Sequence, residues 1–323
     1  MLKRLKTLSW GLFLATLISL SACAKGDSDD ILSGYKTTKV ADHTWYIPGP
    51  RATPNVENKG FMNNPAFTIT DKSVIVYDPG SSVLVGRALI KRIREKTKNP
   101  ITHVFNSHVH GDHWLGNQAF VEENKDVKIY AHPLMIKHAK NGEAKIWIDM
   151  MMDRTKGITK DTVAVLPTEI LKDQQEIKID NITIKAHLAN IKAHTVTDAM
   201  FEIVEDKVLI TGDNAFRDRT TRMDDGSFIG NMKVLDDAMK LPVEVVIPGH
   251  GPAGDKKVLE EYKNFLAVIY NTTKAAMDDD LEVYEIKPKV VEKMTKYKDW
   301  TGFDAGIGKL VGVAALEVEE NDF

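Results

Sequence analysis

The sequence has 323 residues, of which 43% are hydrophobic, so it can bury one large core or two modest ones. Its 43 basic and 46 acidic residues nearly balance, and this formal net charge of −3 argues against nucleic acid as the main partner. Cys23 is the only cysteine, so a disulfide within the chain is excluded. Burial and any bound metal must therefore hold the fold.

The first 22 residues are typical of an export signal rather than of the fold. A basic start is followed by an apolar run from Leu8 to Leu20, which is too short to span a bilayer comfortably. The run ends in Leu20-Ser21-Ala22-Cys23, which resembles the lipobox of bacterial lipoproteins. This resemblance implies that Cys23 is acylated and that the protein is lipid-anchored, facing the periplasm. Ala24 in the second mature position implies the outer membrane of a Gram-negative bacterium. The alternative is an ordinary cleavable signal with an incidental cysteine.

Small, polar and acidic residues over 23–35 predict a flexible tether. We expect a folded domain over residues 36–255 and a helical extension over residues 256–323. Strand-like runs occur in both halves of the domain with helical segments between them, which predicts an α+β fold with two stacked sheets covered by helices. The expected strands are 43–47, 66–70, 73–77, 101–105, 127–132, 176–179, 182–188, 199–204, 207–211 and 243–247. The expected helices are 83–96, 115–122, 135–152, 231–239, a segment through 274, 287–298 and 308–316.

Three histidines and one aspartate follow the strand Ile101 to Phe105 in the spacing H-x-H-x-D-H. Side chains repeat every two residues along an extended segment, so His108 and His110 leave the backbone on the same side. Gly111 then breaks the strand, and Asp112 and His113 sit at a turn. Imidazole and carboxylate are the ligands of catalytic zinc. The motif predicts a metal site, with a histidine-rich surface loop as the alternative.

Three further candidate ligands lie farther along the chain, next to apolar strands. His194 lies in a loop between two expected strands. Asp213 comes just after one apolar strand, separated from it by Thr211-Gly212, and His250 comes just after another, separated from it by Pro248-Gly249. Strand ends that share one edge of a sheet bring such residues into a common cleft. Considered alone, His194 is as typical of a surface histidine as of a metal ligand, and Asp213 is typical of a turn residue.

The combined set resembles the metallo-β-lactamase superfamily of αββα metallohydrolases over roughly residues 40 to 255. The resemblance implies a four-layer αββα sandwich in which His108, His110 and His194 hold one zinc ion. It further implies that Asp112, His113 and His250 hold a second zinc ion, and that Asp213 bridges the two. Asp78 matches a position that supports the ligand histidines in this family.

Two zinc ions per chain predict a metal-dependent hydrolase. A hydroxide shared by the ions, from a water with a pKa of roughly 7, would attack the carbonyl of a small ester, thioester, lactone or amide. Asp112 and Asp213 are the candidate catalytic carboxylates. The alternatives are hydrolysis of β-lactam antibiotics, an iron-containing oxidoreductase of the same fold, and a binding lipoprotein that retains metal for stability.

The substrate is expected to be a small molecule bound by loops at the metal edge. Arg217, Arg219 and Arg222 follow the bridging aspartate and can clamp a carboxylate or phosphate, although a solvated charged loop is an equal alternative. Residues 58–64 are expected to form a flexible flap. Residues 226–231, 248–252 and 300–303 resemble periplasmic metallohydrolases associated with quinoprotein and sulfur-oxidation systems. Oligomer formation through the C-terminal helices is left open.

Overall fold

The computed structural model describes residues 30–322, and Cys23 with the predicted export signal lies outside them. Contacts define one compact unit over Ile31–Phe323. Ile31 and Leu32 are buried against the first helical layer, so the fold begins five residues before the predicted start at Lys36. Apolar side chains at these two positions explain why they pack rather than continue a tether. Within the described residues, no helix is long and apolar enough to cross a membrane.

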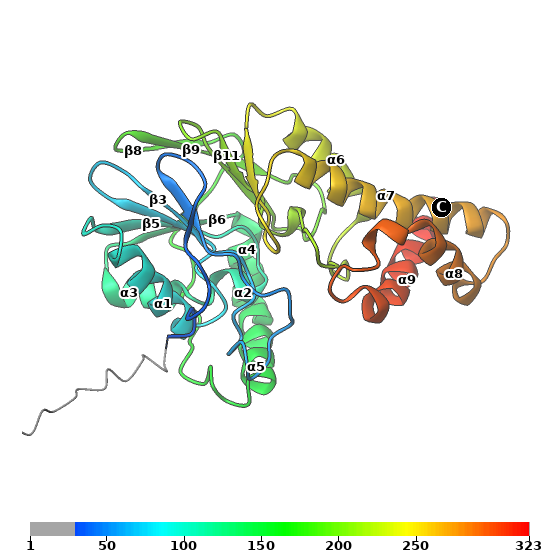
Figure 1. Ribbon diagram of the computed structural model, residues 1–323, viewed down its shortest axis with the longest axis horizontal. Coiled ribbons are helices and arrows are strands. Elements are labelled where there is room, and N and C mark those ends of the chain that lie inside the picture. Colours follow the sequence, from blue (N-terminus) through cyan, green and yellow to red (C-terminus); the bar gives the residue numbers. More distant parts are fainter. Residues whose placement is uncertain (1–29, 323) are drawn as a thin grey trace, which may run out of the picture. The chain divides into compact units, whose positions relative to one another are not determined.

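Twelve strands of the described residues form two mixed sheets. Figure 1 labels β3, β5 and β6 of the first sheet and β8, β9 and β11 of the second. The first sheet has the order β1-β2-β3-β4-β5-β6-β7, and the second has the order β12-β11-β10-β9-β8. The first consists of β1 (Thr38–Lys39), β2 (Thr44–Tyr46), β3 (Ala66–Ile69), β4 (Val74–Tyr77), β5 (Ile101–Phe105), β6 (Lys128–Ala131) and β7 (Glu169–Ile170). The second consists of β8 (Glu176–Ile179), β9 (Ile182–Leu188), β10 (Ala199–Ile203), β11 (Val208–Ile210) and β12 (Val245–Ile247).

Alternating side chains on the strands supply two cores at once. On β4, Val74 and Val76 face the helical layer, whereas Ile75 and Tyr77 face the second sheet. On β10, Phe201 faces the first sheet and Met200 faces the outer helices. The central strands β4 and β10 are therefore buried on both faces, as expected for sheets that pack against a helical layer on one side and against each other on the other. This confirms the predicted four-layer αββα arrangement.

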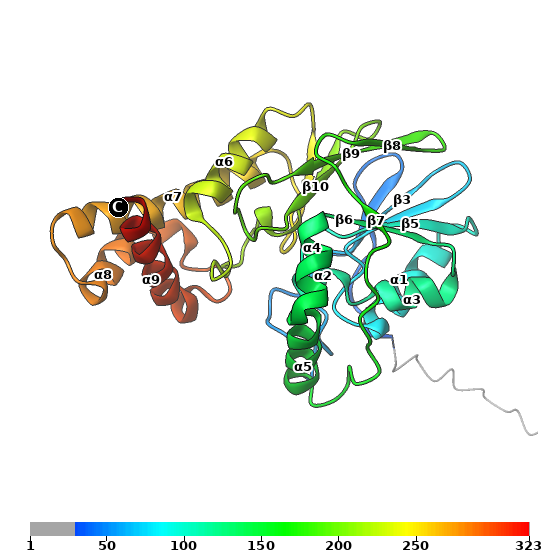
Figure 2. The same cartoon turned by 180° about the vertical axis from the view of Figure 1, so that it is seen from behind.

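Helices cover the two outer faces and continue beyond the second sheet. Figure 1 shows α1 and α3 below the first sheet and α6 and α7 beside the second, and Figure 2 shows α4 and α5 from behind. The helices of the first half are α1 (Val83–Arg94), α2 (Gly111–Trp114), α3 (Asn117–Glu123), α4 (Pro133–His138) and α5 (Ala144–Arg154). Those of the second half are α6 (Phe228–Met239), α7 (Lys257–Asp278), α8 (Val283–Lys293) and α9 (Phe303–Asp322).

Two local predictions were wrong. The helix expected over residues 135–152 is broken near Gly142, whose φ of +115° is incompatible with a regular helix. The segment expected as a flexible flap is buried: Phe61 is fully inaccessible, and the Asn64 side chain donates to the carbonyls of Pro248 and Gly251. Asparagines in this segment fasten it to the chain around β12, which composition alone does not reveal.

Candidate metal centre

All seven predicted ligands meet at the ends of four strands. His108 and His110 follow β5, and Asp112 and His113 lie in the short helix α2 directly behind them. His194 comes from the loop between β9 and β10. Asp213 and His250 follow the parallel neighbours β11 and β12. The ligand atoms form two groups, each within 4.8 Å: His108, His110, His194 and Asp213, and Asp112, His113 and His250.

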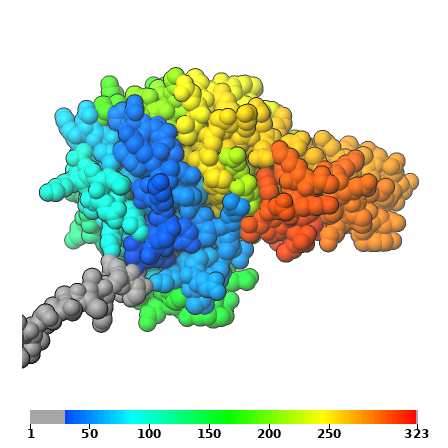
Figure 3. All heavy atoms as spheres, viewed as in Figure 1, coloured from blue at the N-terminus to red at the C-terminus, as the bar shows by residue number. Residues whose placement is uncertain are grey.

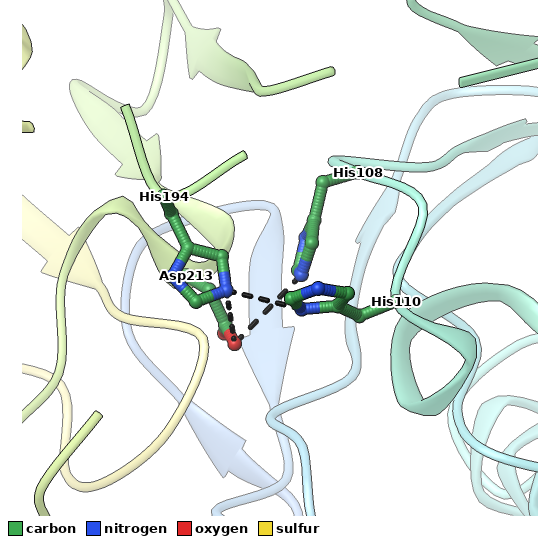
Figure 4. Close-up of side chains that lie close together, drawn as sticks. All are labelled: His108, His110, His194 and Asp213. Atoms are coloured by element: carbon green, nitrogen blue, oxygen red, sulfur yellow. Dashed lines mark hydrogen bonds and ion pairs between the residues drawn. The ribbon is translucent and has the colours of Figure 1, made fainter. Parts of the chain in front are cut away.

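The first group presents three imidazole nitrogens to one carboxylate oxygen. His194 Nε2 lies 3.1 Å from His110 Nδ1 and 3.4 Å from Asp213 Oδ2. His108 Nε2 lies 3.8 Å from the same carboxylate oxygen. Figure 4 shows His108 and His110 on one segment, with His194 and Asp213 approaching the same point from two others. Three nitrogens and one oxygen around a point match the ligand number and types of a tetrahedral zinc site.

The second group lies on the other side of the Asp213 carboxylate. Asp213 Oδ1 is 3.0 Å from His113 Nε2 and 3.4 Å from His250 Nε2. Asp112 Oδ2 is 3.2 Å from His250 Nε2 and 3.5 Å from His113 Nε2. Asp213 therefore offers one oxygen to each group, which is the arrangement expected of a carboxylate shared by two metal ions.

The donor atoms fit a pair of cations. His108 Nε2, His113 Nε2 and Asp213 Oδ1 are buried and make no hydrogen bond within the described chain, although leaving such atoms unsatisfied is costly. Burial lowers the pKa of His113, but the carboxylates of Asp213, Asp112 and Asp78 outweigh burial and raise it well above its usual value. The surroundings therefore favour positive charge here, and two metal cations would satisfy both the charge and the unpartnered atoms.

Burial also prepares the other ligands for metal. It lowers the pKa of the His194 imidazole to about 3, and it lowers the pKa of His108 well below its usual value. Both rings are thus neutral at physiological pH, as a metal ligand must be. Burial alone would raise the pKa of Asp213, but His250 and His113 hold it well below the ordinary range.

Outer partners orient four of the five imidazoles. Asp78 Oδ2 lies 2.8 Å from His113 Nδ1 and also accepts from the Ser107 hydroxyl, which in turn contacts His108 Nδ1 at 3.0 Å. The Met62 carbonyl lies 2.8 Å from His250 Nδ1. These contacts direct the remaining nitrogens toward the centre, and such partners fix ring orientation in metal sites. The supporting role expected for Asp78 is confirmed.

Asp225 is the outer partner of His110, and sequence reasoning missed it. Its Oδ2 lies 3.1 Å from His110 Nε2, which leaves Nδ1 to face the first ligand group. Asp225 lies in a loop 115 residues beyond His110, and an aspartate beside another aspartate carries no signal of this role. Unlike the buried Asp78, this carboxylate is exposed to solvent.

A cleft of about 540 Å³ opens above the ligands. Asp112, Asp213 and His250 lie at its floor, and Trp147 of α5, Phe216 and Arg219 contribute side walls. Its far side consists of Thr301, Gly302, Ala305 and Gly306, which we call the C-terminal wall. The volume falls within the range of about 300–1,000 Å³ typical of small-molecule sites.

The arginines after Asp213 point in different directions. Arg219 lines the cleft, half-buried, with Nη1 3.1 Å from His250 Nδ1, and it forms no ion pair with a described residue. Arg222 also lines the cleft, 5.9 Å from the Trp147 ring centre. The prediction for Arg217 was wrong: its side chain faces away, 3.8 Å from Glu261, and donates to the Ala253 carbonyl. The backbone bridge between Phe216 and His250 fixes the alternation that turns Arg217 outward.

The family model described as the metallo-beta-lactamase superfamily matches residues 60–250, which contain all seven ligands. The chain belongs to this superfamily. A search of curated proteins finds no match.

Solved structures of metallo-beta-lactamases share the superfamily fold with this chain. The metallo-beta-lactamase from Pontibacter korlensis is 16% identical with a TM-score of 0.58, and the match covers 72% of this chain and 98% of that one. VMB-1 is 16% identical with a TM-score of 0.55, covering 72% and 96%. TMB-1 is 17% identical with a TM-score of 0.53, covering 72% and 97%. At such low identity these similarities establish the fold alone.

The superfamily match ends at His250, so the C-terminal wall lies beyond it. The metallo-beta-lactamase superfamily domain thus supplies the floor of the cleft, while helical residues after it supply one side. The sequence predicted the helices of this extension but not their contact with the cleft. Small residues such as Gly302 and Ala305 carry no chemical signal of such a position.

Proposed function

We propose that this protein is a dizinc hydrolase that cleaves a small ester, thioester, lactone or amide. The observation that carries the proposal is the pair of ligand groups sharing Asp213 at the floor of a cleft. Nitrogen and carboxylate ligands are those of catalytic zinc sites, and two zinc ions, when bound, would supply an acidified water and polarise a carbonyl. A nucleophilic side chain is not required.

The two carboxylates at the floor have distinct proposed roles. Asp213 holds both metal positions in register because each of its oxygens faces one ligand group. Asp112 belongs to the second group alone, and His113 and His250 outweigh the effect of its burial and keep its pKa well below the usual value. Asp112 is therefore ionised at neutral pH, as a carboxylate that holds a metal cation must be. These are the residues that we propose act in catalysis.

Arg219 is the proposed anchor for the substrate. Its guanidinium forms no ion pair with a carboxylate of residues 30–322 and lies in the cleft beside His250. A guanidinium of this kind binds a carboxylate or phosphate oxygen in two-point geometry. Phe216, stacked on His250 with ring centres 5.1 Å apart, and Trp147 offer apolar contact on either side. The substrate is therefore proposed to combine an anionic group with an apolar part.

Hydrolysis of β-lactams is the second candidate. The similar solved structures carry the name metallo-beta-lactamase, and a β-lactam has both a carboxylate for Arg219 and a cyclic amide for the metal centre. An iron-containing oxidoreductase is the third candidate, and its ferric ions would absorb visible light, whereas zinc ions would not.

Three substrates separate these candidates in one experiment. Purified protein is stripped of metal, reloaded with zinc, and tested with an acyl thioester, a homoserine lactone and a chromogenic cephalosporin. We expect turnover of the thioester or the lactone that disappears on chelation and returns with zinc. Turnover of the cephalosporin alone supports the β-lactamase candidate. Absence of all three activities from fully zinc-loaded protein contradicts the hydrolase proposal, and visible absorption by metal as purified supports the iron alternative.

We also propose that the protein is a periplasm-facing lipoprotein of the outer membrane, anchored through Cys23. The support is the sequence Leu20-Ser21-Ala22-Cys23 behind a basic and apolar leader. Labelling cells with a fatty-acid analogue tests the anchor. We expect label on the wild-type protein and none on the Cys23→Ser variant, and equal labelling of both would contradict it. The relation to quinoprotein- and sulfur-oxidation-associated enzymes remains part of this proposal.

A further inference from the structure

The cleft is closed on one side by a segment that lies outside the superfamily match. The C-terminal wall belongs to the start of α9 and the turn before it, and it faces the metal centre across the cleft. In Figure 3, the orange-red C-terminal segment adjoins the blue segment that carries residues 51–53 and the yellow-green segment after β11. A substrate that binds at the floor and is large enough to cross the cleft meets this wall.

The wall is fastened to the loop that carries Arg219. The Thr301 backbone N–H donates to the Asp218 carbonyl at 3.1 Å, and the Thr220 N–H donates to the Thr301 carbonyl at 3.0 Å. Arg219 lies between these two bonds, paired with Thr301 in a parallel bridge. These bonds join the wall directly to the loop of the proposed anchor.

Packing and charge hold the rest of α9 in place. Trp300 stacks on Phe265 of α7 with ring centres 4.9 Å apart, and Phe303 and Leu310 are buried in the same core. Farther along α9, Lys309 Nζ lies 2.8 Å from Asp224, and Glu317 accepts from the backbone at the start of α6. A helix fixed at both ends presents its first turn to the cleft as a rigid surface.

Small residues let this surface pack closely against Thr220 and still leave the cleft open. A Cβ atom on Gly302, whose φ is +85°, would meet the Thr220 hydroxyl at 2.8 Å. A Cβ atom on Gly306 would meet only that hydroxyl, at 3.5 Å, so this position tolerates a side chain that then occupies cleft space. The residues here determine how much room remains opposite the metals.

From this geometry we propose that the C-terminal wall is the size-selective part of the substrate site. Ala305 and Gly306 set the largest group that the cleft accepts on the side of the substrate away from the scissile bond. This inference rests on the proposed function and adds to it a substrate class: compounds whose group beyond the anionic anchor is no larger than the room that Ala305 and Gly306 leave.

Two leucine variants on α9 test the wall. Gly306→Leu adds a side chain into the cleft, while Gly312→Leu adds the same side chain where a Cβ atom meets nothing within 4 Å and which does not line the cleft. Both replace a helical glycine and favour the helix equally. Gly306→Ala is the smaller companion variant if Gly306→Leu unfolds, and thermal unfolding and metal content are recorded for each.

The main readout is the binding of thiols to the cobalt-loaded protein, followed by the change in cobalt absorption. The probes are 2-mercaptoethanol and naphthylmethanethiol, which share the metal-binding sulfur and differ in bulk. We expect Gly306→Leu to lower the affinity for the bulky thiol by about tenfold or more, because a side chain that fills part of the cleft excludes groups of that size. The affinity for the small thiol should fall by about twofold or less. Gly306→Ala should shift both values in the same sense but less, and Gly312→Leu should match wild type.

Kinetics then separate this inference from the proposed function. With acyl thioesters of increasing bulk, kcat/KM of Gly306→Leu should fall only for the bulkier members. If wild-type protein hydrolyses none of them, the hydrolase proposal fails while the thiol affinities still report on the wall. Equal affinities of Gly306→Leu and Gly312→Leu for the bulky thiol would overturn the proposal that the C-terminal wall is size-selective. An equal loss of affinity for both thiols in Gly306→Leu would overturn it as well.

Discussion

The floor and the wall of the cleft are built in different ways. At the floor, buried ligands are held by side-chain partners, of which Asp78, 2.8 Å from His113, is itself buried. At the wall, small residues and half-exposed charges meet through backbone bonds, as between Thr220 and Thr301. Changes at the floor should therefore alter metal binding, whereas changes at the wall should alter substrate choice or stability and leave the metals in place.

The largest effect is expected from Asp213→Ala. Among the described residues, Asp213 is the one carboxylate that faces both ligand groups, so both metal positions lose a ligand in this variant. We expect kcat/KM to fall by more than about 100-fold, beyond the range caused by loss of an outer partner, with fewer than two bound metals. Metal analysis and steady-state kinetics check it. Retention of two metals and of normal turnover would contradict the expectation that changes at the floor alter metal binding.

Asp78→Asn should lower the affinity for metal at both positions. Asp78 contacts His113 directly and reaches His108 through Ser107, and its φ of +47° is one that asparagine also tolerates. We expect affinity for metal to drop by about 10–100-fold at both positions, measured by stepwise titration of metal-free protein. An effect confined to one position would show that the path through Ser107 is unimportant.

Asp225→Asn should have a smaller effect that is confined to the first ligand group. Asp225 contacts only His110 among the ligands, and water can partly replace its exposed carboxylate. The same titration should show a loss of about tenfold or less in one binding step, with the other step unchanged. A loss as large as that of Asp78→Asn would show that exposure does not weaken this support.

Arg219→Gln should change substrate affinity and leave metal content unchanged. Because hydrogen bonds to a charged group contribute about 1.5–3 kcal/mol, we expect KM for an anionic substrate to rise about tenfold and KM for a neutral analogue to change little. Arg217→Gln is the matched control, since that side chain faces Glu261 outside the cleft. Equal effects of the two variants on KM would remove Arg219 from the substrate site.

The smallest effect is expected from Glu317→Ala, and it concerns stability. The Glu317 carboxylate accepts from Ser227 Oγ at 2.7 Å and from the backbone N–H groups of Phe228 and Ile229, at the start of α6. Losing this cap should lower the free energy of unfolding by about 1–2 kcal/mol. Chemical denaturation measures it, and an unchanged midpoint would show that α9 does not stabilise α6.

The sequence predicted the floor far better than the wall, for a physical reason. His108 to His113 are close in the chain, and His194, Asp213 and His250 lie beside recognisable strands, so strand geometry brings them together. Arg217 and Arg219 could not be separated, because only the bridge from Phe216 to His250 decides which of them faces the cleft. Asp225, Trp147 and the C-terminal wall depend on tertiary packing between distant segments, which local patterns do not encode.

The most direct test of the central claim is an anomalous difference map at the zinc edge from crystals of the zinc-loaded protein. The account predicts two peaks, one on each side of the Asp213 carboxylate, with His108, His110 and His194 around one and Asp112, His113 and His250 around the other. A single peak, or zinc bound away from Asp213, would contradict it.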